Sequence, residues 1–512
     1  MPQHPSQRTD SPLDALRSSH LYEDCSDTPE VIETHISYLF LTDEHVYKLK
    51  KQVDFGFLDY STVDKRHAAC LNEIKINRQL APDVYLEVTA IGRDDGGNWR
   101  LGQDIEAEDW LVKMSRLPSD RCLETMVEAE NWQDSHLDAI VDRLAAFYQS
   151  LEPVNDAPQK HFEHVVDNQE ELQKSEHELD ADLVRRVHAA QRQYLFLNQE
   201  VFHQRRAEDR VVEGHGDLRV DHIYVTDPPV VIDGIEFSRE LRIVDIADEL
   251  SFFAMTCEIL DAPEVGKRVL RGVLDAMDDQ PDESLLHFFH CYRACVRGKV
   301  QALRATIATG NRERNTQQRA ETYLLVADRH AGRIHQPVAV IVRGLSGTGK
   351  TTLATSLATA LGATHLSTDR IRSQSDDAAN YSEADRLAVY RSLQARAIEK
   401  CQDGQSVVLD GTFLTAPQMQ LAADACQSAC VKFAFVTCTC SDDLALKRIR
   451  ERQADGESES EADQAVFHQQ LDQVESVPSP WPQLEIDTTS DTESQLASLR
   501  TNLPKFLQST DR

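Results

Sequence analysis

The stretch from Val338 to Thr352, VAVIVRGLSGTGKTT, constrains the fold more than any other part of the sequence. It begins with β-branched apolar residues typical of a buried strand, passes through a glycine-rich loop and enters a helix-forming segment. The loop fits G-x-x-x-x-G-K-[ST], in which small residues let successive backbone N–H groups point at phosphate oxygens and at the helix N-terminus. The sequence therefore predicts a nucleotide-binding α/β domain.

Eight residues of the loop are predicted to hold the nucleotide: Gly344, Ser346, Gly347, Thr348, Gly349, Lys350, Thr351 and Thr352. Lys350 is expected to reach the terminal phosphates. Thr351 is expected to offer its hydroxyl to Mg²⁺, a cation that prefers oxygen ligands. The predicted cofactors are ATP and Mg²⁺.

The chain of 512 residues is too long for one hydrophobic core, so two or three domains are expected. Its formal net charge of -32 disfavours nonspecific binding to nucleic acid or anionic lipid. The first thirty residues lack a basic start followed by an apolar core, and no later run approaches the length of a membrane span. We expect a cytoplasmic protein with no nucleic acid or membrane partner, and the sequence indicates no oligomeric state.

The eleven cysteines are scattered, as suits a reducing compartment. Four of them, Cys426, Cys430, Cys438 and Cys440, could be drawn as zinc ligands. The first pair is expected on an alanine-rich helix and the second alternates along a strand, so burial as small apolar residues explains them better.

The N-terminal region is expected to begin with a polar tail, residues 1–12, and a short helix, residues 13–23. A β-hairpin is predicted from strands 31–42 and 45–51, and the SerThrValAsp at 61–64 predicts a capping box opening a helix to about Leu80. That helix carries Glu73. A strand at 110–114 and helices from 120 to 205 follow.

Residues 210–237 form the second stretch rich in chemistry. Short strands at 223–225 and 230–232 are predicted to form a hairpin that returns Asp233 beside Asp217. Two carboxylates at one site suit phosphoryl transfer, because one can take the proton of an attacking hydroxyl while the other holds Mg²⁺ bound to ATP.

With Lys48 on a strand and Glu73 on a helix upstream, residues 31–327 resemble the aminoglycoside phosphotransferase branch of the protein-kinase-like superfamily. The resemblance implies Asp217 as catalytic base, Asp233 as metal ligand, Lys48 as the phosphate-contacting lysine and Glu73 as its ion-pair partner. Lys50 lies on the same strand face as Lys48, so the lysine assignment could shift by two residues.

The region departs from that family in two places. The family usually carries asparagine five residues after the base, whereas this chain has His222, a nitrogen ligand poorly matched to Mg²⁺. Asp221 or a single-metal site could compensate. The first hairpin also lacks the family's glycines, which leaves the ATP phosphates less covered.

Residues near these motifs receive structural interpretations. His215 and Glu236 are expected to support the catalytic loop rather than react. Asp245 and Asp248 precede a helical run and are expected to cap it or to support a loop. Arg293 and Arg297 share a helical stripe, which is interpreted as a solvated face paired with nearby acids, with an anionic substrate as the alternative.

A linker is predicted at 328–337 and a P-loop domain at 338–505. Asp369 and Arg372 are expected at the carboxyl edge of a parallel sheet, where Asp369 could orient a substrate hydroxyl and Arg372 could bind an anion. A helix cap and a surface arginine are the alternatives. Asp410 ends a buried strand and is a candidate Mg²⁺ ligand through water.

Arg448 and Arg452 share a helix face and are candidates for a lid over ATP, with the acidic loop 453–463 after them. With the motifs above, this region resembles the small P-loop kinases related to gluconate kinase and zeta toxin. Motor-type AAA proteins fit less well, because no helical lid subdomain is apparent in the remaining length. The whole chain resembles a bacterial fusion of an aminoglycoside phosphotransferase-like domain with an ATP-binding protein.

The expected fold class is an α+β protein-kinase-like domain followed by an α/β P-loop domain with a parallel sheet. The expected function is an ATP-dependent phosphotransferase with two nucleotide sites and a small-molecule acceptor bearing a hydroxyl. One alternative is an ATP-binding regulatory or scaffold protein with a degenerate kinase-like sensor. Another is a toxin that phosphorylates a cell-wall sugar nucleotide.

Overall fold

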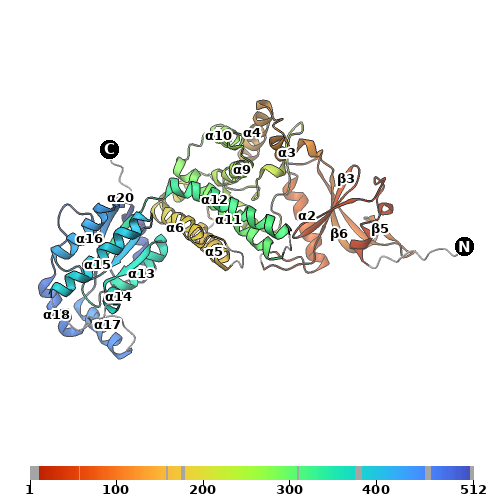
Figure 1. Cartoon of the computed structure of the whole chain (residues 1–512). Helices are drawn as coiled ribbons and strands as arrows, with labels where there is room; N and C mark the ends of the chain where they lie inside the picture. The colour runs from red at the N-terminus through yellow and green to blue at the C-terminus, as the bar shows by residue number, and fades with distance from the viewer. Residues whose placement is uncertain are drawn as a thin grey trace. The chain divides into compact units, whose positions relative to one another are not determined.

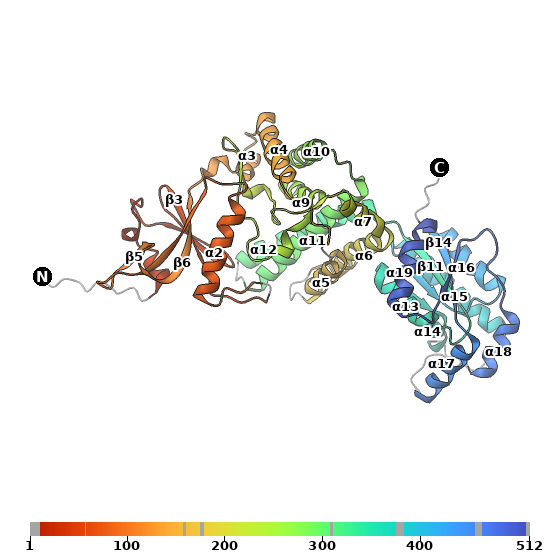
Figure 2. The same cartoon turned by 180° about the vertical axis from the view of Figure 1, so that it is seen from behind.

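The computed structural model describes residues 11–56, 58–156, 160–174, 179–307, 311–374, 383–455 and 463–507 (Figure 1). The chain divides into two compact units that interleave along the sequence. Unit 1 comprises Met1–Pro158 and Arg205–Arg293, and unit 2 comprises Gln159–Gln204 and Ala294–Arg512. Figure 2 shows the same elements from behind.

Unit 1 is built on a six-stranded antiparallel sheet with the strand order β1-β2-β3-β6-β4-β5. Its strands are β1 (Glu30–Glu33), β2 (Ser37–Leu41), β3 (His45–Lys50), β4 (Tyr85–Arg93), β5 (Trp99–Gly102) and β6 (Glu106–Ser115). The short helices α1 (Pro12–Ala15) and η1 (Ser19–Leu21) precede it, in place of one helix over 13–23. The predicted hairpin is present, since β2 pairs with β3.

The single strand predicted at 31–42 is two strands. Thr34 and Ser37 form the turn between them, because the Thr34 hydroxyl accepts from the backbone N–H of Ser37 at 3.0 Å. β1 then folds back on β2 with Glu33 opposite Tyr38. A hydrogen bond between a threonine side chain and the nearby backbone can stabilise a turn in place of an extended strand. In this segment the turn forms.

Helix α2 (Val63–Asn77) packs against the sheet, as Figure 2 shows. The side chain of Thr62 caps it by accepting from the N–H of Lys65 at 3.3 Å. Cys70 and Ile74 contact apolar residues of β4 and β6. The same face buries Glu73 completely, so the glutamate lies against the sheet rather than in solvent.

The rest of unit 1 is mostly helical and includes small strand pairs. Its elements are η2 (Ser119–Arg121), α3 (Leu123–Glu128), α4 (Asp134–Gln149), α7 (Gln199–Ala207, shared at its start with unit 2), β7 (Val211–Glu213), η3 (Val220–His222), β8 (Ile223–Tyr224), β9 (Val230–Val231), α8 (Arg239–Arg242), β10 (Ile243–Asp245), α9 (Ile246–Ile259), α10 (Pro263–Ala276) and the first part of α11 (Glu283–Ile307). Strands β8 and β9 are antiparallel, as the predicted hairpin requires.

Unit 2 contains a five-stranded parallel sheet with the order β12-β13-β11-β14-β15. Its strands are β11 (Val338–Arg343), β12 (Thr364–Ser367), β13 (Val407–Asp410), β14 (Lys432–Thr439) and β15 (Gln483–Asp487). Every residue of β11 is buried, which explains its continuous apolar run. The helices are α13 (Lys350–Leu361), α14 (Thr368–Ser373), α15 (Glu383–Gln402), α16 (Ala416–Ser428), α17 (Asp442–Asp455), α18 (Gln464–Gln473), α19 (Thr492–Asn502) and α20 (Pro504–Leu507).

Alternate residues of β11 enter two cores on opposite faces of the sheet. Val340 and Val342 pack with α13 and α19, whereas Ile341 packs with α15 and α16. Cys438 belongs to the first core and Cys426 to the second. The sheet thus separates two of the four cysteines considered for zinc, and each fills apolar space.

Unit 2 also contains the start of α7, the end of α11 and the helices α5 (His161–Lys174), α6 (Ala181–Leu197) and α12 (Asn311–Ile334). Phe196 and Leu197 at the end of α6 join the core of the P-loop sheet. Residues 328–334, predicted as linker, are the last turns of α12. Their polar character fits a helix surface, because Asp328 pairs with Arg186 of α6 at 2.8 Å.

Within the described ranges, no helix is both long and apolar enough to cross a membrane.

Candidate functional site

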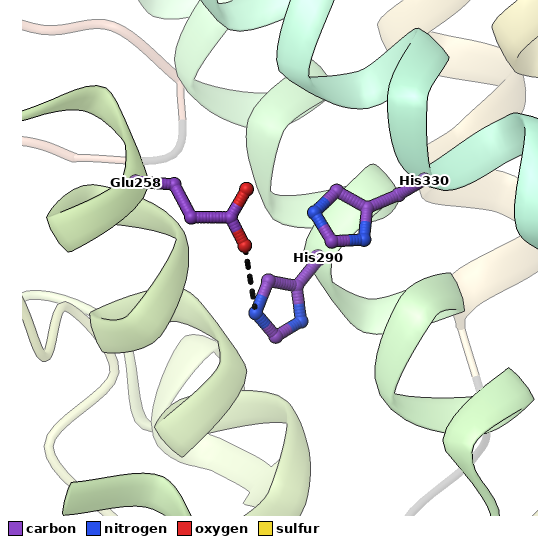
Figure 3. A group of neighbouring side chains, drawn as sticks. All are labelled: Glu258, His290 and His330. Atoms are coloured by element: carbon purple, nitrogen blue, oxygen red, sulfur yellow. Dashed lines mark ion pairs between the residues drawn. The ribbon is translucent and has the colours of Figure 1, made fainter. Parts of the chain in front are cut away.

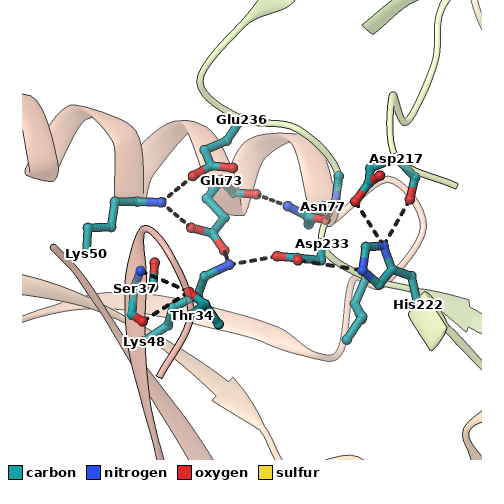
Figure 4. Close-up of polar contacts among 12 residues, drawn as sticks. Thr34, Ser37, Lys48, Lys50, Glu73, Asn77, Asp217, His222, Asp233 and Glu236 are labelled. Carbon is teal, nitrogen blue, oxygen red and sulfur yellow. Dashed lines mark hydrogen bonds and ion pairs between the residues drawn. The ribbon is translucent and has the colours of Figure 1, made fainter. Parts of the chain in front are cut away.

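Lys48 brings together three segments of unit 1 that are far apart in sequence. Its Nζ lies 2.8 Å from Oε1 of Glu73 on α2 and 2.7 Å from Oδ1 of Asp233, which follows β9 (Figure 4). Burial acts to lower the pKa of Lys48, but the two carboxylates outweigh it and hold that pKa well above its ordinary value. The lysine therefore stays charged beside the predicted metal ligand.

Lys50 lies on the same face of β3 but serves a different pair. Its Nζ is 2.6 Å from Oε2 of Glu73 and also contacts Glu236, whose carboxylate accepts from the Tyr60 hydroxyl at 2.5 Å. Both the Lys50 and Glu236 side chains are buried. Because Lys48 rather than Lys50 meets Asp233, the geometry favours Lys48 as the lysine of the site.

The backbone around Asp233 is held by residues that sequence reasoning missed. Asp233 has a φ of +64°, a left-handed conformation that aspartate tolerates better than most residues. Its N–H donates to the Tyr85 hydroxyl at 3.0 Å, and the next N–H, of Gly234, donates to Oδ1 of Asn77 at 2.8 Å. The amide of Asn77 in turn donates to the carbonyl of Glu73 at 3.0 Å. One helix thus positions both the glutamate and the segment carrying Asp233.

Glu249 of α9 organises the loop that begins at His215 and was also missed. Its carboxylate accepts from the backbone N–H of His215 at 3.1 Å, from that of Gly216, and from the Tyr148 hydroxyl at 2.8 Å. Burial, only partly offset by these donors, raises the pKa of Glu249. The only sequence signal was an acidic pair, Asp248 and Glu249, at the start of a helix that is mostly apolar.

His215 makes the backbone contact expected of it, since its Nε2 donates to the carbonyl of Ile232 at 3.0 Å. Burial, reinforced by the nearby His222, lowers its pKa to about 4. A neutral ring at this position joins the start of the loop to the end of β9.

Asp217 and Asp233 face His222 from two sides (Figure 4). The Nδ1 of His222 donates to the carbonyl oxygen of Asp217 at 2.9 Å, and its Nε2 lies 3.8 Å from Oδ2 of Asp233. Arg219 binds Oδ2 of Asp217 at 2.7 Å and also contacts Asp221. The predicted hairpin therefore does deliver both aspartates to one site, with a histidine between them.

Asp245 caps α9 by accepting from the N–H of Ala247 at 2.8 Å, as expected, and also binds Arg205. Asp248 forms a two-point ion pair with Arg293, with both N–O distances 2.7 Å. The solvated face predicted for the arginine stripe is wrong, because Arg293 and Arg297 are both 8% exposed. A buried acid and aromatic rings replace water there.

Glu258 and His290 form another pair in unit 1, on helices α9 and α11 (Figure 3). Oε1 of Glu258 lies 3.6 Å from Nε2 of His290, while Nδ1 of His290 donates to the carbonyl of Leu286 at 2.8 Å. The pair connects two packed helices and takes no part in the loops that carry Asp217 and Asp233.

In unit 2 the P-loop joins β11 to α13 and depends on its glycines. Gly347 has a φ of +80°, and a Cβ there would lie 2.4 Å from the carbonyl oxygen of Ala445 on α17. Thr348 donates its hydroxyl to the carbonyl of Leu345 at 2.8 Å, and Nζ of Lys350 lies 3.4 Å from that same oxygen. Helix α13 begins at Lys350, so its N-terminus points toward the loop.

Gln470 of α18 closes over the loop and was not identified from the sequence. Its Oε1 accepts from the N–H of Ser346 at 2.8 Å, and its Nε2 donates to the Ser346 hydroxyl at 3.0 Å. Arg448 of α17 donates to the carbonyl of Thr488 at 2.8 Å, beside the loop, and Arg452 lies one turn further along. Most of the predicted acidic loop 453–463 lies outside the described residues.

Asp410 ends β13 next to the P-loop strand, where a carboxylate could reach Mg²⁺. It is 2% exposed, and its Oδ1 has no hydrogen-bond partner among the described residues. Nε2 of His365 on β12 lies 3.5 Å from its Oδ2. A buried, unpartnered carboxylate oxygen fits a hard cation such as Mg²⁺.

Asp369 and Arg372 lie on α14, directly after β12 at the carboxyl edge of the sheet. Nη1 of Arg372 is 3.2 Å from Oδ1 of Asp369. The helix cap is Ser367 rather than Asp369, since the Ser367 hydroxyl accepts from the Asp369 N–H at 3.2 Å. The pair is thus at the edge where ligands bind in such sheets.

The AAA domain family matches residues 340–477, which span the P-loop, Asp369, Asp410 and α17. The sequence had favoured small P-loop kinases over motor-type AAA proteins. In the described residues after 477, β15, α19 and α20 belong to the sheet and its core rather than to a separate helical subdomain.

Solved structures that are similar to parts of the chain include a gluconokinase and a choline/ethanolamine kinase family protein. A gluconokinase from Sinorhizobium meliloti 1021 is 18% identical and covers 34% of this chain and 99% of its own, with a TM-score of 0.26. A choline/ethanolamine kinase family protein from Mesorhizobium loti is 11% identical and covers 60% of this chain and 92% of its own, with a TM-score of 0.37.

The uncharacterized protein Rv2004c of Mycobacterium tuberculosis is 32% identical over 464 residues, which is 85% of this chain and 89% of the relative. The match extends well beyond the P-loop region and therefore includes unit 1. The chain belongs to the same family as this mycobacterial protein.

Proposed function

We propose that the chain is an ATP-dependent phosphotransferase with two nucleotide sites that phosphorylates a hydroxyl group of a small molecule in the cytoplasm. The observation that carries the proposal is the position of Lys48, whose Nζ bridges Glu73 and Asp233 at 2.8 and 2.7 Å. In a nucleotide complex, a charged lysine in this position can bind the polyphosphate, and the ionised carboxylate beside it can bind the cation.

At the unit 1 site, Asp217 would orient the acceptor hydroxyl and take its proton. The hydroxyl oxygen would form a bond to the γ-phosphorus of ATP while the bond from that phosphorus to the bridging oxygen of ADP breaks. Desolvation acts to raise the pKa of Asp233, but Lys48 and nearby cationic groups hold it well below its ordinary value. Asp233 would therefore be ionised throughout the physiological range and able to hold Mg²⁺.

At the unit 2 site, the backbone N–H groups from Gly347 to Thr352 and Nζ of Lys350 would bind the phosphates. Thr351 and Asp410 would hold Mg²⁺, which when bound offsets negative charge on the phosphates. Asp369 would orient the acceptor and Arg372 would bind an anionic group. Arg448 and Arg452 would approach the nucleotide from α17.

The test is a screen of hydroxyl-bearing metabolites with ATP, in which phosphorus NMR identifies the phosphorylated product. Asp217→Asn and Lys350→Ala would each be compared with the wild type, with the exposed Asp142→Asn and Lys447→Ala as matched controls. Loss of the acceptor-dependent product in one test variant, with the controls unaffected, supports the proposal. Equal basal hydrolysis of ATP in every protein, with no product for any acceptor, would contradict it.

A second candidate is a regulatory ATP-binding protein whose unit 1 senses a ligand without turnover. The ion pair between Arg219 and Asp217, 2.7 Å long, favours it because Oδ2 of Asp217 then contacts a guanidinium rather than an acceptor hydroxyl. In that case Arg219→Ala would not create transfer activity, and nucleotide binding to both units would be measurable without any product.

A further inference from the structure

The family resemblance implies Mg²⁺ at the unit 1 site, and His222 is the residue that fits Mg²⁺ least. The backbone carbonyl of Asp217 can only accept a hydrogen bond, so Nδ1 of His222, 2.9 Å away, carries the ring proton whenever the imidazole is neutral. Nε2 then presents its lone pair on the opposite side of the ring. A histidine whose other nitrogen donates to a carbonyl is the usual arrangement of a metal-ligating imidazole.

On that side of the ring Nε2 faces two carboxylates, and among the described residues no hydrogen-bond donor lies within bonding distance of it. Oδ2 of Asp233 and Oδ2 of Asp221 each lie 3.8 Å from Nε2, beyond hydrogen-bond distance. The His222 residue itself is only 6% exposed. A separation of this size leaves room for one cation at about 2.1 Å from each of two donor atoms.

Asp233 and Asp221 have different contacts, and these contacts indicate which of the two carboxylates can bind a cation. Lys48 binds Oδ1 of Asp233, which leaves Oδ2 facing His222. Arg219 binds both oxygens of Asp221, so that carboxylate is held by a cation already. The Asp233 side chain is 49% exposed, so a nucleotide phosphate or water can complete the coordination.

We infer that His222 Nε2 and Asp233 Oδ2 form a mixed nitrogen and oxygen site that prefers a first-row transition cation, with Mn²⁺ as the probe, over Mg²⁺. Imidazole nitrogen binds transition cations more strongly than Mg²⁺, which demands oxygen ligands. Asp221 adds negative charge to the surroundings without serving as a ligand. The inference concerns the same site as the proposed function and rests on its assignment of Asp233 as a metal ligand.

The experiment measures Mn²⁺ binding to the full chain with a non-hydrolysable ATP analogue, by electron paramagnetic resonance and by detection of the electron spin echo modulation from coordinated ¹⁴N. His365 lies near Asp410 in unit 2 and could also give a nitrogen signal. His365→Asn is therefore the matched control for His222→Asn, and the double variant defines the background.

We expect the ¹⁴N modulation to persist in His365→Asn and to disappear when His222→Asn is added to it in the double variant. The Mn²⁺ affinity of the unit 1 site should fall about tenfold or more in His222→Asn, while its Mg²⁺ affinity changes less. Asparagine can still donate to the carbonyl of Asp217, and His222→Gln provides a second variant if the first does not fold. Melting curves of each variant identify loss of folding.

Wild-type protein that binds Mn²⁺ without ¹⁴N modulation would overturn the inference, and so would modulation that is equally deep in His365→Asn and in the double variant. Either result would leave His222 as a hydrogen-bonding residue of the loop. Failure of the proposed function would appear differently, as nitrogen-coordinated Mn²⁺ without phosphate transfer to any acceptor.

Discussion

Nζ of Lys48 lies 2.7 Å from the carboxylate of Asp233, although 185 residues separate them in the sequence. The contact joins the sheet of unit 1 to the hairpin that carries Asp233. Two residues further along β3, Lys50 joins the same glutamate to Glu236 instead. Substitutions at these two lysines can therefore distinguish an effect on nucleotide binding from an effect on folding stability.

We predict that Lys50→Met is strongly destabilising, whereas Lys48→Met mainly reduces ATP binding and turnover. Removal of Lys50 leaves Glu236 and one oxygen of Glu73 buried without their cation, at a cost of about 3–5 kcal/mol. Removal of Lys48 has a smaller effect on folding, because Lys50 still neutralises Glu73. Melting curves and nucleotide titration check the pair, and equal loss of stability in both variants would contradict the distinction.

Glu249→Gln is expected to lower kcat with little change in the KM for ATP. The glutamine oxygen can replace only part of a carboxylate that accepts from two backbone N–H groups and from Tyr148. The loss should cost about 1–3 kcal/mol of stability and misplace the loop carrying Asp217. Steady-state kinetics with the acceptor test this, and Tyr148→Phe, which removes a single donor, should give a smaller effect. A rise in KM alone would argue against a positioning role.

Acid should destabilise unit 2 through His188. Burial lowers the pKa of His188 to about 4 from its ordinary 6.5, although its Nδ1 donates to the carbonyl of Val184. Between those pH values the unfolded chain binds the proton and the folded chain does not, so stability is full above pH 6.5 and is lost as the pH falls toward 4.

The matching variant is His188→Leu, which cannot take up that proton. The loss of unfolding free energy between pH 7 and pH 5 should be smaller than in the wild type by about 2 kcal/mol. Denaturant titrations at the two pH values measure it. His203→Leu, at a half-exposed histidine, is the control for the replacement of histidine by leucine on the surface.

Gly362→Ala should disrupt the packing of α6 on the P-loop domain. Gly362 has a φ of +64°, and a Cβ there would lie 2.7 Å from Cα of Ala189. Gly404 has a φ of +75° with nothing near its added Cβ, so Gly404→Ala measures backbone strain alone, about 1 kcal/mol. The denaturant midpoint of Gly362→Ala should be lower than that of Gly404→Ala because of the contact with Ala189. Equal midpoints would mean that α6 moves aside without a loss of stability.

Much of the candidate site could be predicted because its residues occur in short local patterns. The glycines around Lys350 predict a phosphate loop because they allow the positive φ angles and close backbone contacts of that path. The turn between the strands at 223–225 and 230–232 predicts that Asp233 returns toward Asp217. Helix periodicity placed Glu73 on a helix. Each of these inferences uses neighbours within about twenty residues.

The sequence could not predict contacts that depend on distant packing. Glu249 reaches the backbone of Gly216 only because α9 lies beneath that loop, and Gln470 reaches Ser346 only because α18 folds over the P-loop. The helical state of residues 328–334, within the predicted linker, is a related case. These residues are polar, but they are the last turns of α12, where Asp328 pairs with Arg186 of α6.

The sequence by itself determined the phosphate loop, the parallel sheet around it and the types of residues at both sites, because backbone sterics and hydrophobic periodicity act locally. Only the tertiary structure decided that Lys48 rather than Lys50 meets Asp233, and that His222 lies between two aspartates. Those choices follow from how a sheet, a helix and a hairpin pack together, which fixes side-chain distances that no local pattern contains.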